Sequence, residues 1–266
     1  MKILSYNVMS GGFDSYENKE DQPQRLKLIQ NAVKDIDADI VSLIDTYRWD
    51  EIYTNKELCK LFDYKKAYCV NLDDNRLKKL GHNNGITILS NLENINFKTI
   101  NLKSRNSVLS SFKLNNSEIN LFSLYLDDLS EDVRLDQVNE LTKYIKHENK
   151  NIIIGDFNSL SPKNIDSTKE KIDNFLSKNP QFAGLKNQLD DMMRAEVISK
   201  FLDLDFKDAS TNNVNTAPTK LTNLTDEALL RLDFCLYKNL DIKKLEVLTD
   251  EIYDKTSDHY PLLIEV

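Results

Sequence analysis

The sequence has few cysteines, and they are scattered. Only Cys59, Cys69 and Cys235 occur among its 266 residues, and none has the C-x-x-C spacing. This argues against a disulfide framework and against a zinc site built from cysteines. The same sparse usage is typical of a reducing compartment, so we expect a cytoplasmic protein.

Glycine, proline and long apolar runs are scarce as well. Six glycines and five prolines are too few for a flexible linker of any length, and no repeat divides the chain. No apolar run approaches the roughly 18 residues that a membrane-spanning helix needs. The opening stretch Met1–Val8 predicts a strand and not a secretory signal. We therefore expect a single domain over residues 1–266 that does not associate with membranes.

Basic residues are outnumbered by acidic ones. The chain carries 35 Lys and Arg against 43 Asp and Glu, which gives a formal net charge of −8. Lys and Arg supply most of the non-specific affinity of proteins for duplex DNA, so a broad basic surface is disfavoured. Local clusters at 65–66 and 76–79 either form a basic rim or belong to a solvated charged face.

Helical and strand patterns alternate at both ends of the chain. Apolar residues recur at helical spacing over residues 25–35, and Ile40–Ile44 follows as a short apolar strand. A helix is expected over 130–147, with Ser130 as a candidate cap. A charged excursion over 163–202 is expected to form two helices. Further strands are expected at 151–154, 231–237, 243–248 and 261–266.

The middle of the chain predicts strands without intervening helices. Such consecutive strands pair antiparallel, and they are expected at 67–72, 85–90, 95–102, 107–114 and 118–126. Two sheets packed face to face, with helices outside each, accommodate both the middle and the ends. The expected fold is therefore an α/β (α+β) four-layer sandwich, with two mixed β-sheets flanked by helices.

Polar residues stand at the ends of several predicted strands. Asp156 and Asn158 follow the apolar residues Ile152–Ile154, and Asp45 follows Ile40–Ile44. Each could close a turn or cap a strand by bonding to nearby backbone. Asn7 lies in the first strand. Carboxylate and amide oxygens are also the groups that Mg²⁺ or Mn²⁺ prefers, so a hard-cation site is the functional alternative.

Asp233 lies inside an otherwise apolar strand and needs a partner, because burying an unpaired carboxylate is costly. Arg231 and the more distant His259 are the candidates. His259 follows Asp258 just before the last strand and is one of only three histidines. A histidine beside a carboxylate can transfer protons near neutral pH, although the pair also occurs as plain loop chemistry. Phosphate ester hydrolysis is a chemistry that such a set of residues commonly serves.

In this order, the segments resemble the endonuclease/exonuclease/phosphatase superfamily, which has the deoxyribonuclease I-like fold. The resemblance covers nearly the whole chain, and its motifs are Ser5-Tyr6-Asn7, the acidic Asp45, Gly155-Asp156-Phe157-Asn158, Arg231-Leu232-Asp233-Phe234 and Ser257-Asp258-His259. It implies a hydrolase of phosphodiesters or phosphomonoesters that uses Mg²⁺ or Mn²⁺. The substrate is expected to be phosphorylated, with nucleic acid and nucleotides among the candidates, and no protein partner is indicated.

The resemblance also implies a metal site. Asp45 stands where the family usually has a metal-binding glutamate, with Asn7 supporting the ion and Asp258 binding the same or a second one. Aspartate is one methylene shorter than glutamate. The ion would therefore shift, bind through a water, or bind more weakly.

The remaining implied roles concern the reaction itself. His259 would pair with Asp233, which orients the ring. Asp156 or His259 would be the base that activates water, and Asn158 would hold a phosphate oxygen or that water.

A second departure from the family lies at Tyr125, where many members have histidine. Tyrosine there resembles the abasic-site endonuclease branch, and it either contacts the phosphate or belongs to the core. Arg134 fits a structural position of the family's helix. His82, Asn83 and Asn84 either line the cleft or form an exposed loop. The departures at Asp45 and Tyr125 leave a non-catalytic binding or scaffold protein of the same fold as the alternative.

Overall fold

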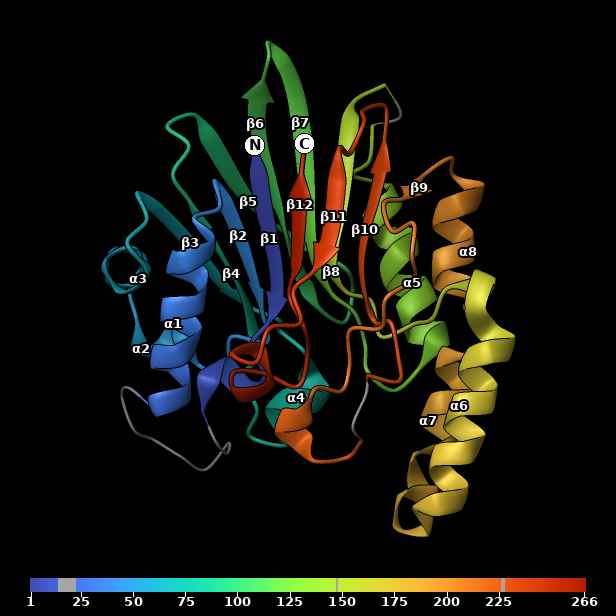
Figure 1. Ribbon diagram of the computed structural model, residues 1–266. Helices are drawn as coiled ribbons and strands as arrows, with labels where there is room; N and C mark the ends of the chain where they lie inside the picture. Colours follow the sequence, from blue (N-terminus) through green and yellow to red (C-terminus); the bar gives the residue numbers. More distant parts are fainter. Residues whose placement is uncertain (14–22, 147, 226–227) are drawn as a thin grey trace.

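The computed structural model describes residues 1–13, 23–146, 148–225 and 228–266. Within them, two six-stranded sheets lie face to face and helices cover their outer faces (Figure 1). The first sheet contains β1 (Lys2–Asn7), β2 (Ile40–Ile44), β3 (Lys66–Asn71), β4 (Gly85–Ser90), β11 (Lys244–Val247) and β12 (Leu262–Glu265). The second contains β5 (Ile95–Asn101), β6 (Asn106–Leu114), β7 (Ser117–Tyr125), β8 (Lys150–Asp156), β9 (Lys207–Asp208) and β10 (Asp233–Lys238).

Both sheets are mixed, as expected. Their strand orders are β11-β12-β1-β2-β4-β3 and β5-β6-β7-β8-β10-β9. The pairs β1·β2 and β7·β8 are parallel, whereas the other neighbouring strands run antiparallel. The expected four-layer sandwich is therefore confirmed.

The side chains of one strand alternate between the apolar core between the sheets and the apolar core under the helices. On β8, Ile152 and Ile154 pack into the apolar core between the two sheets, while Ile153 packs into the core on the outer face. Successive side chains of a strand point to opposite faces, so a strand covered on both sides has apolar residues at every position. This explains the uninterrupted apolar run before Asp156.

Helices cover the outer faces with their apolar sides. On the first sheet lie α1 (Gln24–Ile36) and α3 (Asn55–Phe62), the latter begun by a capping box between Thr54 and Glu57. On the second lie α5 (Glu131–Thr142) and α8 (Glu196–Asp203), which bury Val138, Leu141, Val197 and Phe201. The short helices α2 (Trp49–Ile52) and α4 (Asn75–Lys79) complete the first half of the chain.

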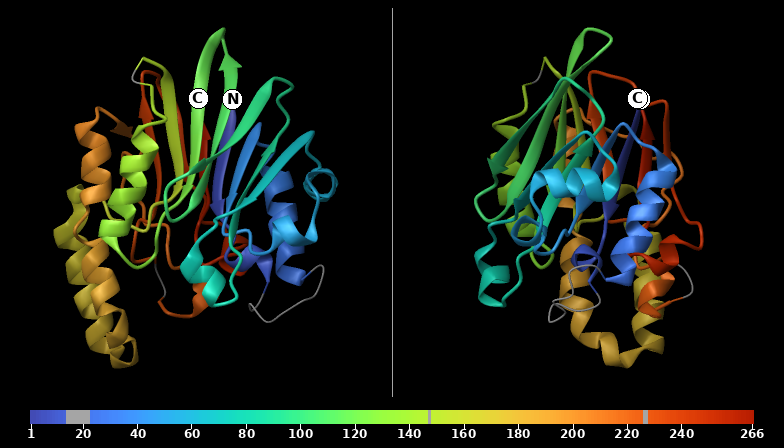
Figure 2. Two further views of the ribbon diagram at one scale, coloured as in Figure 1. Left: turned by 180° about the vertical axis from the view of Figure 1, so that it is seen from behind. Right: turned by 90° about the vertical axis from the view of Figure 1, so that its left-hand side faces the viewer.

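Three expectations about helices need correction. The strands of the middle of the chain were expected to follow one another without helices, but α4 lies between β3 and β4. The excursion over 163–202 contains three α-helices and not two: α6 (Ile165–Lys178), α7 (Lys186–Met192) and α8. Of these, α6 and α7 extend beyond the sheets, as both views in Figure 2 show. The helix expected over 130–147 ends at Thr142, although Ser130 caps it as expected. His147 lies outside the described residues.

Strand ends that are far apart in sequence meet at one edge of the sandwich. In the first sheet, Asn7 pairs with Ile44 and Ile44 pairs with Ile86. In the second, Asp156 pairs with both Tyr125 and Asp233. The polar residues at these ends are thereby gathered at the lower edge in Figure 1. None of the described helices is long and apolar enough to cross a membrane.

Candidate active site

His259 and Asp233 form a buried pair at this edge. His259 Nδ1 lies 2.8 Å from Asp233 Oδ2, and both side chains are more than nine-tenths buried. Burial alone would lower the pKa of His259, but the negative charges of Asp233, Asp258 and Asp156 outweigh it and hold that pKa well above its ordinary value. The imidazole is therefore held protonated. Arg231, the other candidate partner of Asp233, instead binds Asp208 with an Nη1 to Oδ2 distance of 2.8 Å.

Asp156 lies on the other side of the same imidazole. Its Oδ2 is 3.9 Å from His259 Nε2 and accepts a hydrogen bond of 3.0 Å from Asn7 Nδ2, which joins the two sheets. Its Oδ1 accepts a bond of 2.9 Å from the Asn158 backbone. Burial raises the pKa of Asp156 to about 7 against the lowering effect of His259. A carboxyl group with such a pKa can accept a proton near neutral pH.

Gly155 makes the position of Asp156 possible. Its φ of +131° suits glycine, and a Cβ there would lie 2.0 Å from the Leu124 carbonyl oxygen. The parallel strand β7 can therefore approach β8 closely just before the carboxylate. Asn158, two residues after Asp156, has a φ of 47°, which asparagine tolerates better than most residues.

Asp45 occupies a second buried position at the edge. Its Oδ2 accepts a 2.8 Å bond from the Ser10 backbone, and its Oδ1 accepts one from Asn84 Nδ2. Burial raises the pKa of Asp45 to about 6, and the charge of Asp258 adds to the rise. Asp258 itself is partly exposed, and its Oδ1 accepts a 3.3 Å bond from Ser257 Oγ.

Tyr125 faces the same group of carboxylates. Burial raises its pKa well above the ordinary value, and the charges of Asp45 and Asp156 raise it further. The phenol is therefore kept neutral. The guanidinium of Arg105 lies 5.0 Å from the centre of the Tyr125 ring and is held by Asp74 at 2.8 Å and Asp128 at 2.6 Å.

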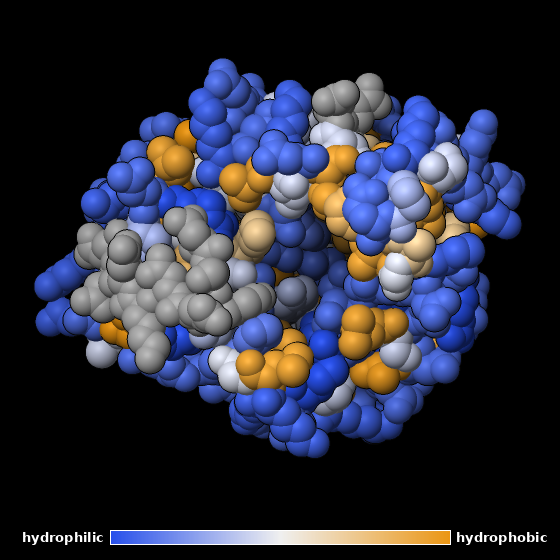
Figure 3. All heavy atoms as spheres, turned by 90° about the horizontal axis from the view of Figure 1, so that it is seen from below, coloured by the Kyte–Doolittle hydropathy of each residue, from blue (hydrophilic) through white to orange (hydrophobic). Residues whose placement is uncertain are grey.

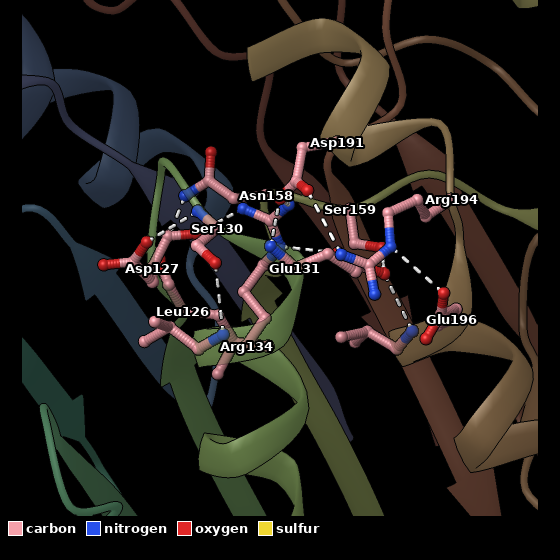
Figure 4. A network of polar contacts seen from close by, with 12 residues as sticks. Leu126, Asp127, Ser130, Glu131, Arg134, Asn158, Ser159, Asp191, Arg194 and Glu196 are labelled. Atoms are coloured by element: carbon pink, nitrogen blue, oxygen red, sulfur yellow. Dashed lines mark hydrogen bonds and ion pairs between the residues drawn. The ribbon is translucent and has the colours of Figure 1, made fainter. Parts of the chain in front are cut away.

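Asn158 is fixed by the segment that precedes α5. Its Nδ2 donates to the Leu126 carbonyl at 3.1 Å. The adjoining network, shown in Figure 4, centres on the fully buried Arg134, which donates to Glu131 Oε2 and to the Asp127 carbonyl, each at 2.7 Å. Within the part of the chain that the structure describes, the polar partners of the Arg134 side chain are Glu131, Asp127 and Asp191, so its role is structural.

The sequence profile of the Endonuclease/Exonuclease/phosphatase family matches residues 4–259 of this chain. The chain belongs to that family. Its members are hydrolases that act as nucleases and phosphatases. No curated protein sequence matches the chain significantly.

Solved structures of the family share the fold at low sequence identity. An AP endonuclease from Archaeoglobus fulgidus is 18% identical with a TM-score of 0.65, and the match covers 99% of this chain and 98% of the endonuclease chain. A 3′ phosphatase from Neisseria bound to product DNA hairpin is 16% identical with a TM-score of 0.64, at 100% and 98% coverage. A mannosyl-6-phosphatase from Bacteroides thetaiotaomicron is 17% identical with a TM-score of 0.61, also at 100% and 98%.

The oxygen atoms around Asp45 fit the hard cation that the family implies. The described ranges contain no group of three or more His, Cys, Asp or Glu side chains placed to bind a metal ion. Mg²⁺, however, binds proteins through one or two carboxylates together with waters and substrate phosphates, so it needs no such group. Asn84 Oδ1, beside Asp45, is buried without a hydrogen-bond partner. This oxygen is therefore open to a ligand such as a water or a cation.

Sequence reasoning missed Arg105 entirely and left Asn84 open between cleft and loop. Asn84 directly precedes Gly85, the first residue of β4, and its side chain is only 3% exposed. Its position directly before a predicted strand was therefore the sequence feature that could have placed Asn84 at the edge of the sandwich where the candidate site lies. No local pattern marks Arg105, because its partners Asp74 and Tyr125 lie 31 and 20 residues away along the chain.

Proposed function

We propose that this protein is a divalent-metal-dependent phosphoesterase, in which an activated water attacks the phosphorus in line with the leaving group. The observation that carries the proposal is the buried row Asp233, His259 and Asp156, in which one imidazole lies between two carboxylates at the edge of both sheets. A carboxylate pair of this kind, desolvated around a histidine, is typical of functional sites. Membership of a family of nucleases and phosphatases supports the same class of reaction.

Asp233 and His259 have different roles at one side of the phosphate: Asp233 orients the ring, and His259 stabilises charge. Asp233 binds Nδ1 and so directs Nε2 toward Asp156 and the substrate. The protonated imidazole then stabilises negative charge that develops on a phosphate oxygen, as an oxyanion-stabilising donor does. Of the two candidate bases, we assign this electrostatic role to His259.

Asp156 is the base in this proposal. Its carboxyl group lies beside the imidazole, and Asn7 and Asn158 hold it in place with hydrogen bonds of 3.0 and 2.9 Å. It would orient the attacking water and take its proton. Tyr125, kept neutral, donates a hydrogen bond to the phosphate, and Asn158 binds a phosphate oxygen from the neighbouring side.

A Mg²⁺ or Mn²⁺ ion would be held by Asp45 and Asn84, with Asn7 and Asp258 supporting it. When bound, it would neutralise the negative charge on the phosphate. Asp45 is held by Ser10 and Asn84, so its carboxylate is already oriented. Burial raises the pKa of Asp45 to about 6, and this supports the assignment, because a bound cation would favour the charged carboxylate.

A substrate panel tests the proposal. Purified protein would be assayed with Mg²⁺, with Mn²⁺ and with EDTA against abasic DNA, single-stranded DNA, RNA, nucleotides, inositol phosphates, sphingomyelin and an aryl phosphodiester. We expect turnover with the metals and none in EDTA. Turnover that persists in EDTA contradicts the metal requirement, and no turnover with any substrate favours a non-catalytic binding protein of the same fold.

A further inference from the structure

A mainly apolar pocket opens directly onto the candidate active site. It has a volume of about 280 Å³, and one side is formed by the site residues Asn158, Asp258 and His259. The other walls are apolar side chains from α6, from α7 and from the segment before β10, among them Ile172, Phe175, Leu189, Met192, Leu230 and Leu232. Figure 3 shows the hollow in this face, with hydrophobic side chains gathered along its border.

The pocket wall offers little to a polar ligand. Apart from the three site residues, Gln188 is the one polar side chain among the described residues that line it. Gln188 Nε2 donates one of its two hydrogens to the Asp128 carbonyl at 2.8 Å, and Asn158 Nδ2 donates one to Leu126, so few polar groups of the wall remain for a ligand. A sugar or a nucleobase placed here would lose more hydrogen bonds to water than this wall replaces.

The charge of the wall also discriminates between ligands. Within the described part of the chain, no Lys or Arg lines this pocket. A nucleic acid strand running through it would bring further phosphates, whose binding depends on cationic side chains. The wall therefore suits an uncharged apolar group attached to a phosphate bound beside His259.

We propose that this pocket binds an alkyl chain of the substrate, so that the protein hydrolyses an amphiphilic phosphate ester. The inference rests on the phosphoesterase function proposed above, because the pocket matters only if the phosphate lies at His259 and Asn158. Binding would remove the methylene groups of the alkyl chain from water and bring them into contact with the aliphatic side chains of the pocket wall.

A series of substrates with alkyl groups of increasing length tests whether the pocket binds the alkyl chain. The substrates are methyl, butyl, hexyl and octyl 4-nitrophenyl phosphodiesters, used below their micellar concentrations. Burial of one methylene is worth about 0.8 kcal/mol, so kcat/KM should rise about fourfold per added methylene until the pocket is filled. A parallel series with oligoethylene glycol chains of the same lengths should show no such rise. Equal kcat/KM values across the alkyl series overturn the inference while leaving the phosphoesterase function intact.

Two pocket variants and a control test whether the preference for long alkyl chains arises in this pocket. Leu189→Ser should lower the octyl to methyl ratio of kcat/KM at least fivefold, and Leu189→Trp should lower it by filling the pocket. The control is Leu80→Ser, the same change at a leucine that is 61% exposed and lies outside the pocket, and it should leave the ratio unchanged. Thermal melting checks folding of each variant. A ratio unchanged in both Leu189 variants overturns the inference.

A binding measurement separates the two proposals. Calorimetry with octylphosphonate and methylphosphonate needs no turnover. Octylphosphonate should bind the wild-type protein at least tenfold more tightly, and Leu189→Trp should remove the difference. Equal affinities of the wild-type protein overturn the alkyl pocket. Absent turnover combined with this preference would overturn the phosphoesterase function and leave the pocket as a binding site for apolar anions.

Discussion

Asp233 Oδ2 and His259 Nδ1 lie 2.8 Å apart although the residues are 26 positions apart in the sequence. Asp233 is the first residue of β10, in one sheet, whereas His259 precedes β12, in the other. The contact therefore exists only when the sheets pack face to face. A buried carboxylate that would destabilise an isolated strand is compensated by a charge from the opposite sheet.

The first prediction concerns the pKa of His259. Asp233 raises this pKa, so Asp233→Asn should lower it. NMR titration of the His259 imidazole in EDTA measures it directly. In the variant the imidazole should lose its proton at a lower pH than in the wild type, and kcat/KM at neutral pH should fall about 100-fold or more. The same titration midpoint in both proteins would contradict the assigned pairing.

The second prediction concerns Gly155. A Cβ at this position meets the Leu124 carbonyl, so Gly155→Ala should lower the free energy of unfolding by about 2 to 4 kcal/mol. Gly184→Ala is the matched control, because a Cβ there has no atom within 4 Å. Chemical denaturation compares the two variants. Equal stability of both would show that β7 and β8 do not approach as described.

The third prediction concerns Arg105, which lies against the Tyr125 ring and pairs with Asp74 and Asp128. Arg105→Met leaves Asp74 and Asp128 without their buried partner and should cost about 3 to 5 kcal/mol of stability. Lys103→Met removes an exposed cation that contacts Asp136 and should change stability by less than about 0.5 kcal/mol. Urea unfolding of both variants measures the difference, and a loss below 1 kcal/mol for Arg105→Met would contradict the role.

The fourth prediction concerns the metal. Asn84→Ala removes the unpartnered oxygen and the bond that holds Asp45, so Mn²⁺ affinity should fall about tenfold. Its neighbour Asn83, which donates to Asp50 and Glu51, provides the control Asn83→Ala, with a change below twofold. Electron paramagnetic resonance of free Mn²⁺ measures binding without turnover. Unchanged affinity in Asn84→Ala would place the metal elsewhere.

The fold was predictable because its signals are local. Apolar periodicity gave most strands to within one or two residues, and the uninterrupted apolar run before Asp156 marked a strand covered on both faces. The third helix of the excursion was missed because charged residues dominate that stretch. Leu185, which directly precedes α7, is 39% exposed and lines the pocket.

Part of the candidate site could be picked out from the sequence because polar residues stand at the ends of apolar strands. Asn7, Asp45 and Asp156 are of this kind, whereas Asp233, expected inside a strand, is the first residue of β10. The registers of the strands bring these residues to one edge. The residues alone left Arg231 and His259 open as partners of Asp233, and the family resemblance implied His259. The structure pairs Asp233 with His259, because the packing of the sheets brings them together and Asp208 binds Arg231. The apolar pocket has no sequence signature, since its wall is assembled from several stretches that are far apart in the chain.

Substitution of His259 decides whether this histidine acts on a phosphate at this edge of the sandwich. Hydrolysis of an aryl phosphodiester would be measured in Mg²⁺ for the wild type, for His259→Ala and for His82→Ala, the same change at a histidine that does not line the pocket beside His259. We predict that His259→Ala loses at least about 100-fold in kcat and that His82→Ala retains wild-type turnover. Wild-type turnover by a folded His259→Ala protein would contradict the account.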